Sequence, residues 1–201
     1  LSFAKQLEEF SEDISNNFPE ASEACLSAAQ IFSQVKERIR KLESIDDLEL
    51  ENFLERSIKP LWDEVRKWSG SKWPVSSLEK DLTQSQQTLS PSDFGFHNSL
   101  QQSNGNLRFI DFEYFGRDDP VKLIADFLWH PAMSLKPAYK RRWLGGMFNI
   151  FCQDSELRQR FQAAWPLYGL RWALILLNEY HPDGWQKRLY AKPNAHRDRK
   201  Q

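Results

Sequence analysis

Hydrophobic residues recur at helical spacing over residues 3–68. The clearest series is Ile31, Val35, Ile39 and Leu42, which places four apolar side chains on one face of a helix while charged residues occupy the other faces. The pattern therefore predicts amphipathic helices whose apolar faces pack together in the first third of the chain.

The hydrophobic pattern changes in the middle of the chain. Residues 69–77 are rich in Gly, Ser and Pro, which predicts a loop, and a short helix is expected over residues 78–86. After Asn98 the period becomes two, and Asn104-Gly105 separates the short segments "SLQQ" and "LRFID". Asn-Gly between two such segments is typical of a tight β-hairpin, because both residues tolerate positive φ. One small β-hairpin is therefore predicted here.

Helical periodicity returns after the hairpin. Helices are expected over residues 119–130, 138–151 and 155–179, followed by a turn, a last short helix and a tail at residues 191–201. The expected fold class is mainly α with one small β-hairpin.

Composition and charge exclude several classes of partner. The 201 residues include 27 basic and 28 acidic side chains, for a formal net charge of -1, so neither nucleic acid nor a membrane is an expected partner. The longest apolar run, residues 173–177, is too short to span a bilayer, and the N-terminus lacks the layout of a signal peptide. Cys25 and Cys152 have no metal-ligand spacing, so reduced, buried thiols in a cytoplasmic protein are expected.

Acidic and amide side chains flank the predicted hairpin. Asn98 follows Asp93 by five positions just before the first strand, and Asp111 follows the second strand. A short hairpin brings its two ends together, so these three side chains are expected to converge. Phosphoryl transfer requires a carboxylate that receives the proton of the attacking hydroxyl and hard oxygen ligands that bind Mg²⁺. The spacing therefore predicts a phosphotransferase site.

The tripeptide Asp93-Phe94-Gly95 spells the magnesium-binding signature of protein kinases, but its position argues against that role. In kinases the catalytic loop contains an Asp followed five residues later by an Asn, and the magnesium-binding Asp comes after a short hairpin. Asp93 with Asn98 matches the first pattern, and Asp111 occupies the second position. Asp93 is therefore predicted to be the catalytic base.

The segments "LSPSDFGFHNSL" and "LRFIDFEYFGRDDPVKLIADFLWHP" resemble the aminoglycoside phosphotransferase and choline kinase family, which has a protein-kinase-like fold. The resemblance implies that Asp93 is the base and that Asn98 and Asp111 bind Mg²⁺. It also implies that Asp126 supports the catalytic loop by binding its backbone amides. Glu113 is a possible further contact with metal or substrate. The chain departs from the family at Pro91, where a His is usual.

The resemblance is strongest over residues 90–131 and implies the C-terminal lobe of that fold. The expected organisation is a helical segment at 1–68, a loop and short helix at 69–92, the catalytic loop, hairpin and metal segment at 93–131, helices at 132–190 and a tail at 191–201. No Gly-rich strand pair or Lys-bearing strand precedes the helices, and the chain starts at Leu1 rather than Met. We therefore expect a fragment whose N-terminal β lobe belongs to the same protein.

The function implied is transfer of a phosphoryl group from ATP, or another nucleoside triphosphate, to a hydroxyl of a small molecule, with Mg²⁺ as cofactor. Pro91 and the missing N-terminal lobe favour a second hypothesis, a non-catalytic pseudoenzyme or binding scaffold of the same fold. A metal-dependent hydrolase built on Asp93 and Asp111 is a third, although no second cluster of acids or histidines accompanies them. His97 and His130 are expected to have structural roles.

Overall fold

A computed structural model describes residues 1–14, 18–74 and 78–181 of the chain. The described part is mainly helical and contains two small antiparallel sheets. The helices are α1 (Ser2–Ile14), α2 (Ala28–Glu43), α3 (Leu48–Phe53), α4 (Lys59–Lys72), α5 (Pro120–Trp129), α6 (Pro137–Ile150) and α7 (Leu157–Leu176). The strands are β1 (Thr88–Ser90), β2 (Ser99–Gln101), β3 (Leu107–Phe109) and β4 (Gly116–Asp118).

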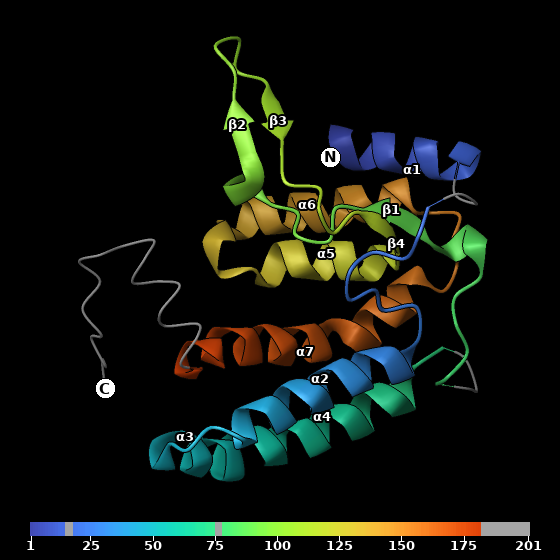
Figure 1. The fold of residues 1–201 in the computed structure, drawn as a ribbon. Coiled ribbons are helices and arrows are strands. Elements are labelled where there is room, and N and C mark those ends of the chain that lie inside the picture. The colour runs from blue at the N-terminus through green and yellow to red at the C-terminus, as the bar shows by residue number, and fades with distance from the viewer. Residues whose placement is uncertain (15–17, 75–77, 182–201) are drawn as a thin grey trace.

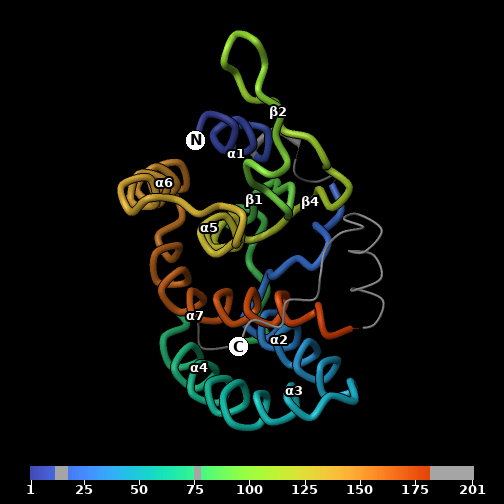
Figure 2. The backbone as a smooth tube through the Cα atoms, turned by 90° about the vertical axis from the view of Figure 1, so that its left-hand side faces the viewer, coloured from blue at the N-terminus to red at the C-terminus, as the bar shows by residue number. Residues whose placement is uncertain are grey.

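Helix α7 lies at the centre of the helical layers. It packs against α5 on one side and against α2 and α4 on the other (Figure 1). Seen after a quarter turn, α5 and α6 form the layer above α7, and α2, α3 and α4 form the layer below it (Figure 2). Side chains on α5 and α7 can therefore meet across the central interface, and both helices contribute to the candidate site.

The predicted apolar face of the α2 segment is confirmed. Ile31, Val35, Ile39 and Leu42 are buried, and the last three form a cluster with apolar residues of α3, α7 and the turn after α3. Burying a Val, Leu or Ile side chain contributes about 1.5–3 kcal/mol relative to leaving it exposed. Hydrophobic periodicity thus determines how α2 docks against α7.

The predicted hairpin is also confirmed. Strand β2 pairs with β3 in the register Ser99↔Phe109, and Gly105 in the turn has φ +84°. The hairpin projects from the body of the molecule beside α1 (Figure 1).

A second sheet was not predicted. Strand β1 pairs with β4 in the register Ser90↔Gly116. A Cβ at Gly116 would lie 2.5 Å from the backbone N of Ala21 and 2.6 Å from the carbonyl oxygen of Pro19, so only glycine fits where this sheet meets the segment after α1. The sheet connects segments far apart in the sequence, and strands of three residues have no periodicity that could announce them.

Three sequence predictions need correction. The helix expected over residues 78–86 is reduced to one 3₁₀ turn, Gln84–Gln86, and α4 continues to Lys72, into the segment expected to be a loop. Cys25 is buried as expected, but Cys152 is exposed just beyond α6. The expected last helix and tail lie outside the described residues.

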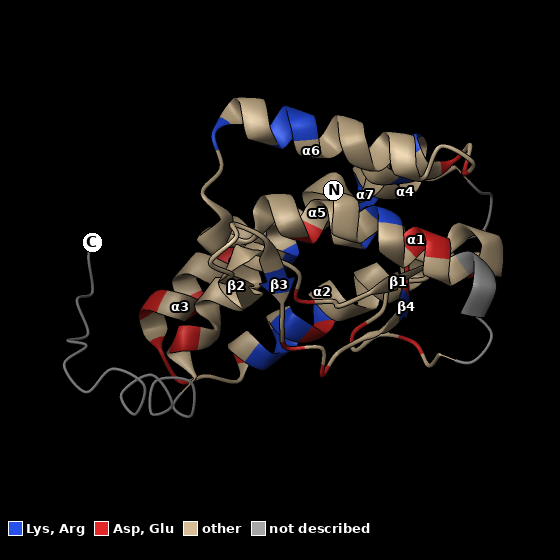
Figure 3. Cartoon of the chain, turned by 90° about the horizontal axis from the view of Figure 1, so that it is seen from above, with Lys and Arg blue, Asp and Glu red and all other residues tan. Residues whose placement is uncertain are grey.

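Acidic and basic side chains are distributed over most of the molecule, with basic residues on α6 and acidic residues on α3 (Figure 3). Among the described residues, no helix is long and apolar enough to cross a membrane.

Candidate active site around Asp93

Asp93 lies in the loop that follows β1. The preceding residue, Ser92, has φ +64°, a left-handed conformation that is costly for a side chain other than Gly, Asn or Asp. The Asp93 N–H donates to the carbonyl oxygen of Pro91 at 2.8 Å, which closes a tight turn. The Asp93 side chain is 40% exposed.

Asn98 binds Asp93 in two ways. Its Nδ2 donates to the Asp93 carbonyl oxygen at 2.9 Å and to Asp93 Oδ2 at 3.1 Å. An amide that donates through Nδ2 keeps its Oδ1 as an acceptor or metal ligand. The five-residue spacing read from the sequence thus corresponds to direct contact between the two side chains.

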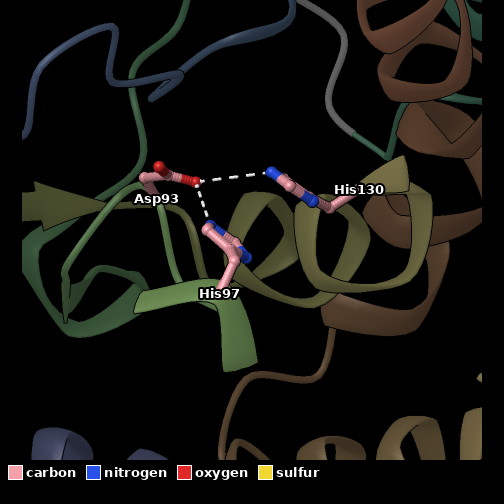
Figure 4. A group of neighbouring side chains, drawn as sticks. All are labelled: Asp93, His97 and His130. Carbon is pink, nitrogen blue, oxygen red and sulfur yellow. Dashed lines mark hydrogen bonds and ion pairs between the residues drawn. The ribbon is translucent and has the colours of Figure 1, made fainter. Parts of the chain in front are cut away.

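Two histidines, which the sequence analysis treated as structural, also face Asp93 (Figure 4). His97 Nε2 lies 3.0 Å from Asp93 Oδ1, and His130 Nε2 lies 3.8 Å from the same oxygen. The two rings are stacked with centroids 4.0 Å apart and planes 8° apart. Burial, together with electrostatic repulsion from His97, lowers the pKa of His130, which favours its neutral form.

Asp111 lies next to this loop because the hairpin closes. The Ile110 N–H donates to the carbonyl oxygen of Asn98 at 3.0 Å, so Asp111 follows a residue bonded to the loop. Asp111 is exposed and has φ +66°. A hydrogen bond with Glu113 and the negative charges of Glu113, Asp111 and Asp93 raise the pKa of Tyr114, which places all three acids within electrostatic reach of one hydroxyl.

Asp126 has a different role from the one expected. Among the described residues, its carboxylate accepts hydrogen bonds from Arg171 Nη1 at 3.2 Å and from Trp172 Nε1 at 2.8 Å, rather than from backbone amides of the loop. Both partners are on α7, so Asp126 joins α5 to α7. Trp172 in turn contacts the His130 ring edge-on, with centroids 4.5 Å apart, and Asp126 therefore supports the loop only indirectly.

Direct support of the loop comes from Lys122. This residue is 1% exposed, and its Nζ donates to Ser92 Oγ at 3.0 Å and to Asp118 Oδ2 at 2.7 Å. Burial opposes the charge, but the carboxylates of Asp118 and Asp126 outweigh it and raise the pKa of Lys122. A protonated Lys122 cannot take a proton from Ser92, so the pair stabilises the loop and is not a Ser-Lys nucleophile.

A cavity of about 400 Å³ opens beside Asp93. Its lining comes from the segment before α2, the Asp93 loop, the segment between β3 and β4, α5 and α7. It consists of Ser22, Glu23, Ser92, Asp93, Tyr114, Asp126, Arg171, Trp172 and Ile175. Glu23, with φ +55°, is the third described residue other than glycine with positive φ, after Ser92 and Asp111. Glu23 and Ser92 line this cavity, and such strained residues cluster at functional sites.

Two groups of side chains are candidates for metal binding. Asp93, His97 and His130 offer ligand atoms within 4.8 Å of one another. A metal ion lies close to the plane of each imidazole that binds it, however, and two rings stacked face to face with centroids 4.0 Å apart are poorly oriented to share one ion. Asn98, Asp111 and Glu113 instead offer the oxygen ligands that Mg²⁺ prefers.

The structure therefore brings Asp93 and Asn98 into contact and places the backbone of Asp111 next to that of Asn98, while Glu113 lies beside Tyr114. It adds residues that the sequence analysis missed, chiefly His97, His130, Trp172 and Lys122. One signal was available for Lys122, because Lys122 and Asp126 are four residues apart and so share one helix face in a mostly apolar segment. His97 is four residues after Asp93, but nothing in the sequence connects either residue to His130.

Comparisons with protein-family models, with curated proteins and with solved structures found no match to this chain.

Proposed function

We propose that this protein is a phosphotransferase that transfers the γ-phosphoryl group of ATP, or of another nucleoside triphosphate, to a hydroxyl of a small molecule. The observation that carries the proposal is the contact of Asp93 with Asn98 beside the hairpin that leads to Asp111. One carboxylate is thus available as a base, and a second carboxylate and an amide are available for Mg²⁺. The resemblance to the aminoglycoside phosphotransferase and choline kinase family supports the same assignment.

In this mechanism Asp93 orients the acceptor hydroxyl and receives its proton as the oxygen attacks the γ-phosphorus. Asn98 Oδ1 and the Asp111 carboxylate would bind Mg²⁺, which neutralises charge on the phosphates when bound. Glu113 is a candidate for a further contact. An N-terminal lobe of the same protein would bind the rest of the nucleotide, as the resemblance implies.

The cavity beside Asp93 is the candidate site for the acceptor. Its carboxylates, from Glu23, Asp93 and Asp126, outnumber its one guanidinium, from Arg171, and Tyr114 and Trp172 contribute aromatic surface. A neutral or cationic hydroxyl compound fits this lining better than an anionic one, because negative charge would be repelled. The pocket volume suits a ligand of small size.

The test uses the protein expressed from its complete reading frame and a panel of sugars, amino alcohols and aminoglycosides. Release of nucleoside diphosphate with Mg-ATP is followed for wild type, Asp93→Asn and the control Asp63→Asn, which changes an exposed acid on α4. We expect transfer by wild type and the control and a loss of roughly 10²–10⁴-fold in kcat for Asp93→Asn. Turnover of Asp93→Asn within a few-fold of wild type would exclude Asp93 as the base.

Calorimetric titration of Mg-ATP separates the enzyme from a scaffold. Magnesium-dependent binding that Asp111→Asn weakens would support the metal assignment. Absence of both binding and transfer would indicate a non-catalytic scaffold of the same fold.

A further inference from the structure

The His97 ring is fixed on three sides, although it lies near the surface. A Cβ at Gly95 would lie 2.4 Å from His97 Cε1 and 2.5 Å from Nδ1, so the ring occupies space that only glycine leaves open. Gly95 has φ -176°, an extended conformation open to any residue, so glycine is favoured here because it leaves space for the His97 ring. His130 covers the ring face, and Asp93 lies at Nε2.

His130 is fixed in turn by its surroundings. The backbone N–H of Ala132 donates to His130 Nδ1 at 3.1 Å, and Trp172 packs edge-on against the ring. A neutral imidazole that accepts at Nδ1 carries its proton on Nε2. His130 therefore presents an N–H toward Asp93 Oδ1, and it also supplies the flat surface against which His97 stacks.

The two oxygens of Asp93 have different surroundings as a result. Oδ1 faces the Nε2 atoms of both histidines, at 3.0 and 3.8 Å. Within the described part of the chain, Oδ2 accepts one hydrogen bond, from Asn98 Nδ2 at 3.1 Å, and a carboxylate oxygen has room for a second partner.

We propose that His97 is a positioning residue for Asp93: it donates Nε2–H to Oδ1, fixes the plane of the carboxylate, and leaves Oδ2 as the oxygen that receives the proton of the acceptor hydroxyl. This inference rests on the proposed phosphotransferase function. His130 and Gly95 act through His97, because one stacks on its ring and the other leaves space for it. Gly95 of the Asp93-Phe94-Gly95 tripeptide therefore has a steric role: it leaves space for the ring that positions Asp93. It has no role in metal binding.

Two substitutions at position 97 separate the hydrogen bond from the stack. His97→Gln keeps an N–H donor near the position of Nε2, whereas His97→Phe keeps a flat ring on His130 and loses the donor. We expect His97→Phe to lower kcat roughly 10–100-fold, with KM for Mg-ATP unchanged, and His97→Gln to recover most of the loss. A purely structural role for His97 predicts the opposite order, because Phe preserves the packing better than Gln.

A second measurement does not depend on turnover. Ring ¹⁵N spectra of histidine-labelled protein report which nitrogen of His97 and His130 carries the proton. We expect the Nε2–H form at both, and Asp93→Ala should shift the His97 Nε2 signal while the His130 tautomer is unchanged.

The outcomes distinguish this inference from the function on which it rests. Absence of transferase activity in the wild-type protein would overturn both the proposed function and the positioning role of His97. If the wild-type protein is active, a wild-type kcat for His97→Phe would overturn the positioning role alone. An Nδ1–H form of His97 would do the same. If addition of Zn²⁺ converts both histidines to the Nδ1–H tautomer, the histidines form a metal centre. That result would also overturn the positioning role of His97.

Discussion

The two halves of the candidate site are built differently, although both depend on an aspartate in a loop. Asp93 contacts Asn98 and His97. It follows Ser92, whose hydroxyl accepts a hydrogen bond from a buried lysine, Lys122. Asp111 is exposed on a segment whose neighbours Ile110 and Phe112 are 43% and 41% exposed. The proposed base is therefore positioned by the fold itself, whereas the segment around Asp111, the proposed metal ligand, has little packing around it and would gain its order from Mg²⁺ and nucleotide.

This comparison makes Lys122 the residue with the largest expected effect on stability. Lys122→Met removes the cation between Asp118 and Asp126 and leaves a buried carboxylate without its partner. Breaking a buried ion pair in this way costs about 3–5 kcal/mol. Urea unfolding followed by circular dichroism should show this loss, and the exposed substitution Lys140→Met should change the free energy of unfolding by less than about 0.5 kcal/mol.

The double variant Lys122→Met/Asp118→Asn tests whether the unpaired charge of Asp118 causes the loss of stability. Neutralising Asp118 removes the unpaired charge, so part of the lost stability should return. A Lys122→Met protein within about 1 kcal/mol of wild type would contradict the buried network as the support of the loop.

A smaller effect is expected at Glu23, where the network reaches the cavity rim. Burial favours the neutral acid, but hydrogen bonds and charges from Arg171 and Arg38 outweigh it and lower the pKa of Glu23. A lowered folded-state pKa contributes stability above the unfolded pKa, and this contribution is lost as the pH falls through the folded pKa. The stability difference between wild type and Glu23→Gln should therefore be largest at neutral pH and shrink below about pH 4.

Urea unfolding at neutral and acid pH measures this difference. Glu64→Gln, at an exposed position on α4, is the matched control and should show little difference at either pH. A Glu23→Gln difference that grows in acid would have the wrong sign for this network.

The smallest effect on stability is expected at Asp111. Asn adopts the left-handed conformation about as readily as Asp, and Asp111 is exposed, so Asp111→Asn should change the free energy of unfolding by less than about 0.5 kcal/mol. Magnesium-dependent nucleotide binding should nevertheless fall in the same variant. A loss of more than about 1 kcal/mol of stability would show that Asp111 contributes to the packing of the fold, as the residues around Asp93 do.

Local signals predicted much of the fold. Ile31, Val35, Ile39 and Leu42 identified the buried face of α2, and Asn104-Gly105 identified the β2–β3 hairpin, because both depend on neighbours within a few residues. The β1–β4 sheet, the missing helix at 78–86 and the exposure of Cys152 could not be read in this way. Each of them depends on segments that are distant in the sequence.

The candidate site likewise combines features that depend on local sequence with features that depend on distant segments. The spacing of Asp93, Asn98 and Asp111, and the hairpin between Asn98 and Asp111, follow from the sequence, because hydrogen-bonded turns are local. The pairing of Asp126 with α7, the support of Ser92 by Lys122 and the stacking of His97 on His130 depend on tertiary contacts. Those contacts join residues up to 46 positions apart, across the α5–α7 interface for Asp126 and between α5 and the Asp93 loop for Lys122. They exist because buried charged and polar groups each require a partner.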